Sequence, residues 1–316
     1  MSDKAKIVIA LGGNALQSKD SAPTAEAQLT VIKQTCERIA EIRLQGYDVT
    51  LVHGNGPQIG RIILASETAR DVVPPMPFDV CGAMSQGYIG YHLQQSLRYA
   101  LSQQGCNTEV VTLATQVLVA RDDPAFLAPS KPIGPFYSQS EAEILTREKG
   151  YIMREDAGRG WRRVVGSPLP KRIVEIDAVK KMADTAIVIT CGGGGIPVIE
   201  NADGSLEGVA AVIDKDFAAE LLAEELDADV LLILTEVEKV AVHFNTPQQR
   251  DLSRLTIARA NRYIEEGHFS PGSMLPKVQA ALKFVRRYPK RRAIITSLDK
   301  ALQALEGKTG TFFEFS

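Results

Sequence analysis

Short apolar runs alternate with longer amphipathic segments along most of this chain. The runs are rich in β-branched and aliphatic residues, as buried strands are, and they cover residues 6–11, 48–53, 186–190, 229–235 and 292–297, with a further strand region at 108–120. The segments between them carry apolar side chains at helical spacing, and they cover residues 25–46, 57–70, 84–105, 216–228 and 273–288. This alternation predicts an α/β fold, a three-layer α/β/α sandwich around a mostly parallel sheet.

Residues 121–170 interrupt this alternation. The segment is rich in residues that break regular structure: Pro124, Pro129, Pro132, Pro135, Gly158, Gly160, Pro168 and Pro170. This composition favours an inserted flap or lid subdomain over another strand–helix–strand unit. With 316 residues, the chain is expected to divide into an N-terminal lobe, residues 1–210 including the flap, and a C-terminal lobe, residues 211–316.

Composition narrows the functional classes. The chain is 45% hydrophobic and 23% charged with a net charge of -2, which does not favour binding to nucleic acid or an anionic membrane through bulk charge. Its apolar runs are much shorter than the roughly 20 residues of a bilayer span. The apolar stretch of residues 7–11 is also shorter than a signal peptide core. The four cysteines lack zinc-site spacing, so we expect small buried residues in a reducing cytoplasm.

Glycine clusters follow three of the predicted strands. They are LGGN with Gly12 and Gly13, HGNGP with Gly54 and Gly56, and CGGGG with Gly192 to Gly195. Ligands of parallel sheets bind at the carboxyl ends of the strands, and exposed backbone N–H groups there suit phosphates. One such loop alone would indicate only a tight turn. The segment GNGPQIG reads GxGxxxG, one residue longer than the dinucleotide fingerprint, which weakens a nicotinamide-binding oxidoreductase as an alternative.

Two lysines lie at predicted helix starts. Lys215 stands between Asp214 and Asp216, and Lys277 directly follows Pro276. One interpretation makes either aspartate an N-cap and leaves Lys215 in solvent. A cation at a helix N-terminus is unfavourable, however, unless an anion lies beside it. Together with the glycine loops and with Lys131 on the flap, these lysines indicate a polyanion held from two sides. His53 adjoins the second glycine loop, where substrate contact is one alternative and a structural role is the expected one.

These motifs resemble the carbamate kinases of the amino acid kinase superfamily. The segments that occur there in the same order are ALGGNA, VHGNGPQIG, CGAMSQGYIGY, SKPIGPFY, REDAGRGW, GGGGIPVI, VIDKD, ILT, TPQQR and PGSMLPK. The resemblance extends from residue 6 to about residue 312. The flap segments SKPIGPFY and REDAGRGW are the most specific, because other branches of the superfamily lack them in this form.

The resemblance implies a role for each matching residue. Lys215 and Lys277 would contact the phosphoryl group in transfer and the β-phosphate, Asp216 would hold the two lysines, and Lys131 would close over the acceptor. The implied substrate-binding residues are Gly12, Gly13, Asn14, Gly54, Asn55, Gly56, Gly193 and Gly194. The implied nucleotide-binding residues are Thr235, Glu236, Phe244, Gly272, Met274 and Pro276. The N-terminal lobe would thus bind carbamate and the C-terminal lobe ATP or ADP.

The implied reaction is reversible phosphoryl transfer between ATP and carbamate, in a cytoplasmic homodimer of arginine metabolism. No carboxylate cluster suggests a metal site, so Mg²⁺ is expected to be held by phosphates and water. A relative acting on a small carboxylate such as acetylglutamate is the nearest alternative. Such an enzyme would need an arginine for the distal carboxylate, whereas Arg61 lies beyond the loop, past Gly60. A catalytically silent nucleotide-binding protein is the second alternative.

Overall fold

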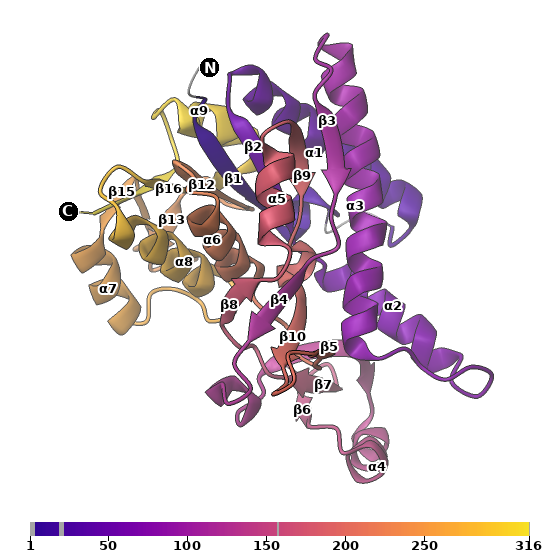
Figure 1. Cartoon of the computed structure of the whole chain (residues 1–316). Coiled ribbons are helices and arrows are strands. Elements are labelled where there is room, and N and C mark those ends of the chain that lie inside the picture. Colours follow the sequence, from indigo (N-terminus) through magenta and orange to yellow (C-terminus); the bar gives the residue numbers. More distant parts are fainter. Residues whose placement is uncertain (1–3, 19–21, 157, 316) are drawn as a thin grey trace.

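A computed structural model describes residues 4–18, 22–156 and 158–315. Its main sheet has eight strands in the order β15-β17-β16-β12-β1-β2-β9-β3 (Figure 1). Neighbouring strands are parallel except β16 and β17. The strands are β1 (Lys6–Leu11), β2 (Asp48–His53), β3 (Glu109–Thr112), β9 (Ala186–Ile189), β12 (Val230–Thr235), β15 (Arg254–Thr256), β16 (Arg292–Ser297) and β17 (Thr311–Glu314). The predicted mostly parallel sheet is therefore confirmed.

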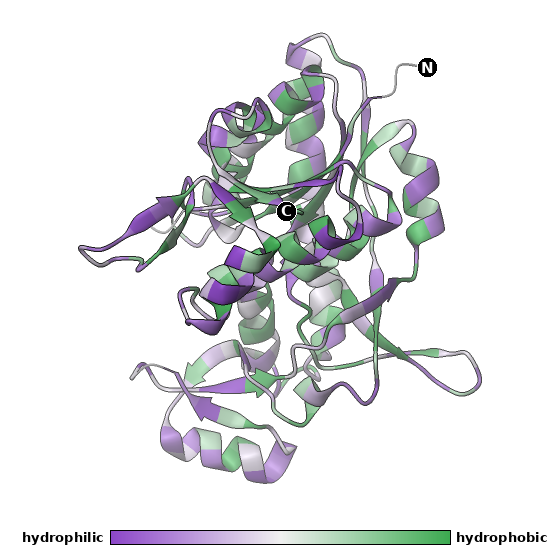
Figure 2. Ribbon diagram, turned by 90° about the vertical axis from the view of Figure 1, so that its left-hand side faces the viewer, coloured by the Kyte–Doolittle hydropathy of each residue, from purple (hydrophilic) through white to green (hydrophobic). Residues whose placement is uncertain are grey.

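Helices cover both faces of this sheet, as the sandwich requires. In β1, Ile7 and Ile9 pack in one hydrophobic core, whereas Val8 and Ala10 pack in the other. The first core includes α1 (Ala25–Leu44), α3 (Phe78–Gln103) and α9 (Ala301–Leu305). The second includes α5 (Ile176–Ala183), α6 (Lys215–Glu225), α7 (Ile257–Glu265) and α8 (Met274–Arg287). Figure 2 shows the central strands mostly in the green of hydrophobic residues, since both of their faces are buried.

The expected strand region 108–120 is two strands in two different sheets. Strand β4 (Gln116–Val119) leaves the main sheet and joins a four-stranded sheet of order β11-β10-β4-β8. Its partners are β8 (Pro170–Ile173), β10 (Ile196–Glu200) and β11 (Leu206–Gly208). The chain changes sheets at Thr115, whose backbone N–H and C=O both bind the Gln86 side chain of α3. A distant side chain therefore ends the strand, which a local apolar pattern does not reveal.

The flap is an antiparallel subdomain below the main body in Figure 1. It contains a three-stranded sheet of order β5-β7-β6 and one helix. The elements are β5 (Lys131–Tyr137), α4 (Gln139–Lys149), β6 (Met153–Glu155) and β7 (Trp161–Val165). Ser138 and Glu141 form a capping box at the start of α4, and Gly150 ends the helix in the left-handed conformation. This confirms an insertion rather than a strand–helix–strand unit; its residue 157 lies outside the described part.

Other predicted boundaries differ modestly. Helix α2 (Gly56–Thr68) begins directly after the second glycine loop, and α3 begins at Phe78, earlier than the predicted Met84. Pro77 at the N-cap of α3 marks this start, because proline suits the beginning of a helix. A small two-stranded sheet, β13 (Val240–Val242) with β14 (Arg250–Leu252), follows β12. Among the described helices, none is both long and apolar enough to cross a membrane. All four cysteines are free.

Candidate active site

The three glycine loops meet at one edge of the main sheet. They follow β1, β2 and β9, which are adjacent and parallel, and Thr235 ends the neighbouring parallel strand β12. The Asn14 side chain donates to the Thr235 carbonyl at 3.3 Å and links the ends of β1 and β12. A cavity of about 1000 Å³ opens between this edge and the start of α8. The sheet topology thus brings the predicted loops together.

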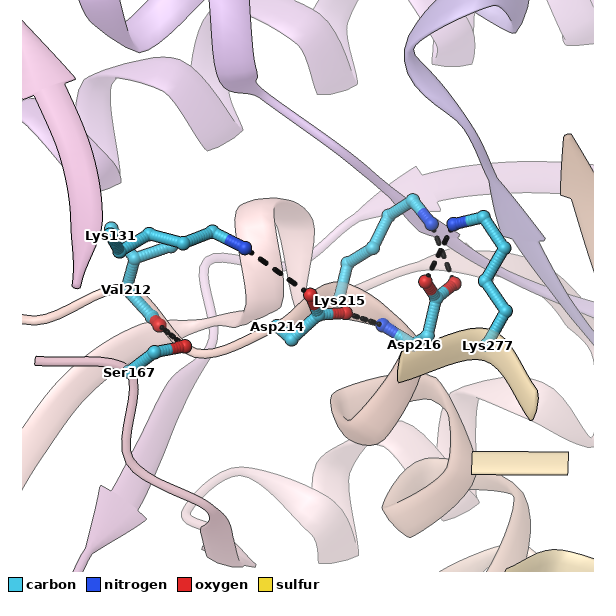
Figure 3. Close-up of polar contacts among 7 residues, drawn as sticks. All are labelled: Lys131, Ser167, Val212, Asp214, Lys215, Asp216 and Lys277. Atoms are coloured by element: carbon cyan, nitrogen blue, oxygen red, sulfur yellow. Dashed lines mark hydrogen bonds and ion pairs between the residues drawn. The ribbon is translucent and has the colours of Figure 1, made fainter. Parts of the chain in front are cut away.

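Asp216 joins two lysines at the floor of this cavity (Figure 3). Its two carboxylate oxygens lie 2.6 Å from Lys215 Nζ and 2.8 Å from Lys277 Nζ. Lys215 and Asp216 begin α6, and Lys277 lies in the first turn of α8. Asp216 is 2% exposed and each lysine side chain 12%. The anion that makes two cations tolerable at helix starts is therefore part of the protein.

The three ionisable groups of this cluster differ in how the protein shifts their pKa values. Burial alone would raise the pKa of Asp216, but Lys215 and Lys277 outweigh burial and lower it to about 2. Burial also lowers the pKa of Lys215, and Asp216 offsets only part of this change. For Lys277 the effect of burial is outweighed by Asp216, which raises the pKa. With two ammonium groups on one ionised carboxylate, the floor of the cavity has a surplus of positive charge.

The flap reaches Asp214, the N-cap of α6, through Lys131, which does not itself line the cavity. Its Nζ lies 3.3 Å from Asp214 Oδ2, and the side chains are 31% and 15% exposed. The other oxygen of Asp214 accepts a hydrogen bond of 3.0 Å from the Asp216 backbone N–H. The N-cap interpretation is therefore confirmed for Asp214, whereas the solvated position considered for Lys215 is wrong, because Asp216 holds that side chain inside.

The second and third glycine loops pack directly against this cluster. A Cβ on Gly54 would lie 3.4 Å from Lys215 Cδ, so the lysine stem runs across that glycine. A Cβ on Gly193 would lie 2.2 Å from the Asn55 side chain, and one on Gly194 only 2.0 Å from the Ile213 carbonyl oxygen. The Asn55 amide in turn donates to Ser85 Oγ at 2.9 Å. Gly193 and Gly194 are needed because their neighbours leave no room for a side chain, whereas a Cβ on Gly54 would make an ordinary van der Waals contact.

His53 has a structural position under these loops. It is buried, and its Nδ1 lies 2.8 Å from the Gly54 carbonyl oxygen. Burial lowers its pKa to about 4, so the ring is neutral near pH 7 and Nδ1 carries the proton it donates. A Cβ on Gly192 would lie 2.4 Å from Nε2, which shows how closely the ring packs on the third loop. His53 therefore shapes the loops, as its sequence position suggested.

The cavity contains only part of the predicted set. The predicted residues that line it are Gly12, Gly13, Asn14, Lys215, Thr235, Glu236, Phe244, Met274 and Lys277. Asp216 binds Lys215 and Lys277 and does not line the cavity. Outside the lining too, Gly54 lies against the Lys215 stem, Gly193 against Asn55 and Gly194 against Ile213. Within the described part of the chain, Gly56, Gly272 and Pro276 lie near these residues in sequence but do not line the cavity.

Sequence reasoning missed several lining residues. They include Lys239, His243 and His268. The imidazole rings of the two histidines meet edge to face, with centroids 4.5 Å apart. His243 has a φ of 53°, a left-handed conformation uncommon outside glycine. Single histidines outside a recognisable motif gave no local signal. The closeness of Lys239 to the end of β12 was the one usable clue, since ligands gather at strand ends.

Comparison with known proteins agrees with this geometry. Residues 5–297 match the amino acid kinase family. A carbamate kinase of Clostridium perfringens is 56% identical over 97% of this chain and 98% of its own length, and one of Pyrococcus horikoshii is 50% identical with the same coverage. A solved carbamate kinase from Giardia lamblia bound to AMP-PNP has a TM-score of 0.95 and 42% identity and covers 100% of both chains. This chain therefore belongs to the amino acid kinase family and, within it, to the carbamate kinases.

Proposed function

We propose that this protein catalyses reversible phosphoryl transfer between ATP and carbamate, giving ADP and carbamoyl phosphate. The observation that carries the proposal is the buried Asp216 with its two lysines on the floor of a cavity that the first glycine loop lines. Phosphoryl transfer needs positioning and positive charge on the oxygens in transfer, and this arrangement offers both. The chain's membership among carbamate kinases identifies the acceptor class.

The chemistry requires no general base. A carbamate oxygen already carries negative charge, so it can attack the γ-phosphorus while the bond from phosphorus to the β,γ-bridging oxygen breaks and ADP leaves. Lys215 and Lys277 would stabilise the charge on the transferred group and on the β-phosphate. Gly12, Gly13 and Asn14 would bind the transferred phosphate. We assign carbamate to Gly54, Asn55, Gly56, Gly193 and Gly194, of which Gly54 lies against the Lys215 stem.

We assign the nucleotide to the part of the cavity formed after β12. Thr235, Glu236, Phe244 and Met274 line it, with Gly272 and Pro276 beside them at the start of α8. The division of labour is thus acceptor binding by residues 1–210 and nucleotide binding by residues 211–316. The lobes share one sheet, since β1 pairs with β12 and β2. This continuity holds the two substrates in a fixed relation.

Mg²⁺ fits this site as a companion of the nucleotide. The carboxylates of Asp214 and Asp216 are engaged by lysines, and among the described residues no group of three or more His, Cys, Asp or Glu could hold a metal ion. Phosphate oxygens and water would therefore supply most of its ligands. When bound, the ion would neutralise phosphate charge. The protein's own residues would orient the nucleotide and the acceptor.

A homodimer is the assembly we propose. Helix α3 exposes Val80, Met84, Tyr91 and Tyr99, which are 38%, 47%, 59% and 64% exposed. Large apolar side chains gathered on one helix favour burial against a partner, and a second copy is the partner that the family implies. Light scattering should give twice the mass of the chain, and Tyr91→Glu should give the monomer. A cytoplasmic location and a place in arginine metabolism are proposed on the family alone.

The test of function is a coupled assay for ATP formation from ADP and carbamoyl phosphate. Acetylglutamate, offered with ATP to the same preparation, should accept no phosphate above background. Arg61 supports this expectation, because its guanidinium binds the Pro23 carbonyl at 2.6 Å and Gln17 Oε1 at 3.1 Å, away from the acceptor loops. Equal specificity constants for the two acceptors would contradict carbamate specificity. A folded protein that binds ADP without turnover would support the silent alternative.

A further inference from the structure

Asp214 lies between the flap and the lysine cluster and contacts both. One carboxylate oxygen accepts from the Asp216 backbone N–H at 3.0 Å and caps α6. The other faces Lys131 Nζ at 3.3 Å (Figure 3). Because the cap fixes the first oxygen, the second is held toward the flap. Asp214 therefore presents a fixed negative charge to the flap lysine.

The contact with Lys131 is the weaker kind of ion pair. Charge-assisted N–H···O bonds are usually about 2.7–2.9 Å long, as those of Asp216 at 2.6 and 2.8 Å nearly are. The Lys131–Asp214 pair is longer and its lysine side chain is 31% exposed, against 12% for the other two lysines. An anion that enters beside Asp214 can therefore compete for Lys131 at low energetic cost.

The base of the flap is attached differently on its other side. Ser167 Oγ donates to the Val212 carbonyl at 2.8 Å, and the Val212 N–H donates to the Gly166 carbonyl at 3.0 Å. These hydrogen bonds join uncharged groups, so an anionic substrate does not compete for them. Lys131 pairs in register with Val165, directly before Gly166. Ile133 and Val165 also pack in one buried apolar cluster with residues of α2 and α3. The backbone of the base is thus held by uncharged contacts, and the side chain of Lys131 is the part held by charge.

We propose that Asp214 is a positioning residue that holds the Lys131 ammonium group until an anionic substrate binds. When the flap closes, the substrate replaces the Asp214 carboxylate as the partner of Lys131. This rests on the proposed function, in which Lys131 reaches the acceptor. Lys131, Lys215 and Lys277 carry three positive charges against the two negative charges of Asp214 and Asp216. A phosphoryl group brings more negative charge than one carboxylate and draws Lys131 away from Asp214.

Asp214→Asn is the decisive variant, because asparagine caps a helix as well as aspartate does but carries no charge. Without carbamoyl phosphate, hydrogen exchange measured by mass spectrometry should become at least threefold faster in β5 and β7. The KM for carbamoyl phosphate should fall about threefold, because Lys131 no longer has to leave a competing anion. In a Lys131→Met background, the same substitution should change neither quantity.

Asp123→Asn is the matched control. Asp123 also caps a short helix near the flap, with Oδ1 accepting from Ala125 N at 2.9 Å, but its Oδ2 accepts from the Leu169 backbone N–H instead of a lysine. It should leave exchange and KM unchanged. A raised KM in Asp214→Asn, or an effect that persists in the Lys131→Met background, would overturn the proposal. If wild-type protein forms no ATP, the proposed function fails, while hydrogen exchange still decides the role of Asp214.

Discussion

The floor of the cavity and the flap both hold lysine against an aspartate at the start of α6, in opposite ways. On the floor, Lys215 and Lys277 are 12% exposed and held at 2.6 and 2.8 Å by one buried carboxylate. On the flap, Lys131 is 31% exposed and lies 3.3 Å from a carboxylate on another element. The same residue type is therefore tightly held in one region and loosely held in the other.

This difference shows how a site can have preorganised charge for the reaction and still let substrates enter. Charge fixed before the reaction needs no reorganisation when the transition state forms, which makes it effective for catalysis. Charge carried on a flap can leave while substrates enter, and it excludes water when it returns. The contrast predicts that floor substitutions affect turnover, whereas flap substitutions affect acceptor binding.

Lys215→Met should have the largest effect. Removing a fixed charge from the transition state typically lowers the rate by on the order of 10² to 10³, and the methionine stem can still pack on Gly54. We expect this loss in kcat with an unchanged circular dichroism spectrum. Lys33→Met, an exposed position on α1, is the control. A folded variant within a few-fold of wild type would remove Lys215 from the catalytic groups.

Gly194→Ala should disturb both regions, because it displaces the chain before Asp214. Its φ is 96°, and the added Cβ would lie 2.0 Å from the Ile213 carbonyl oxygen. We expect a loss of about 3 kcal/mol in the free energy of unfolding, measured by urea denaturation. Gly204→Ala separates strain from collision, since Gly204 has a φ of 83° but open space around it. If both variants lose the same unfolding free energy, the backbone near Ile213 moves to make room for the new Cβ, and only the strain of a positive φ remains.

Glu220 tests whether two lysines are needed to keep a buried carboxylate ionised. It lies one turn after Asp216 on α6, is fully buried, and pairs with one lysine, Lys283 of α8, which is 50% exposed, while Glu224 lies beside it. Burial, with a further contribution from Glu224, raises the pKa of Glu220 to about 7 from 4.5. The folded state therefore binds this proton more tightly than the unfolded state does, and stability falls as pH rises from about 4.5 to 7.

Glu220→Gln should remove this dependence. Between pH 5.5 and pH 8, wild-type protein should lose about 2 kcal/mol of unfolding free energy more than the variant. Urea denaturation of both proteins at the two pH values measures the difference. If the two proteins respond equally to pH, one lysine suffices to keep Glu220 ionised in the fold.

Lys131→Met should have the smallest effect and a different character. We expect about a tenfold increase in the KM for carbamoyl phosphate, equal to about 1.4 kcal/mol, with ADP affinity by calorimetry unchanged. Lys149→Met, at the exposed end of α4 on the same flap, is the control. Loss of ADP affinity with normal acceptor binding would place Lys131 on the nucleotide side and end the distinction between floor and flap.

The main sheet and the glycine loops could be predicted from sequence because both are local signals. An apolar run predicts a strand, and glycines after it predict a close approach. The second sheet could not, since β4 leaves the main sheet where Gln86, from a distant helix, binds Thr115. The sharing of Asp216 between two lysines likewise depends on α6 and α8 packing side by side. The resemblance supplied these roles, and spacing alone would not have.

Strand β1 has a consequence for synthesis of the protein. It is made before the other strands of the main sheet, but one of its two neighbours there is β12, and Lys6 and Asp229 are 223 residues apart. At about 5–20 residues per second, β12 is translated roughly 10 to 45 s after β1. Until then one edge of an apolar strand has no partner, and such edges pair with other chains. We therefore expect nascent chains of this protein to depend on chaperones until the ribosome has completed β12.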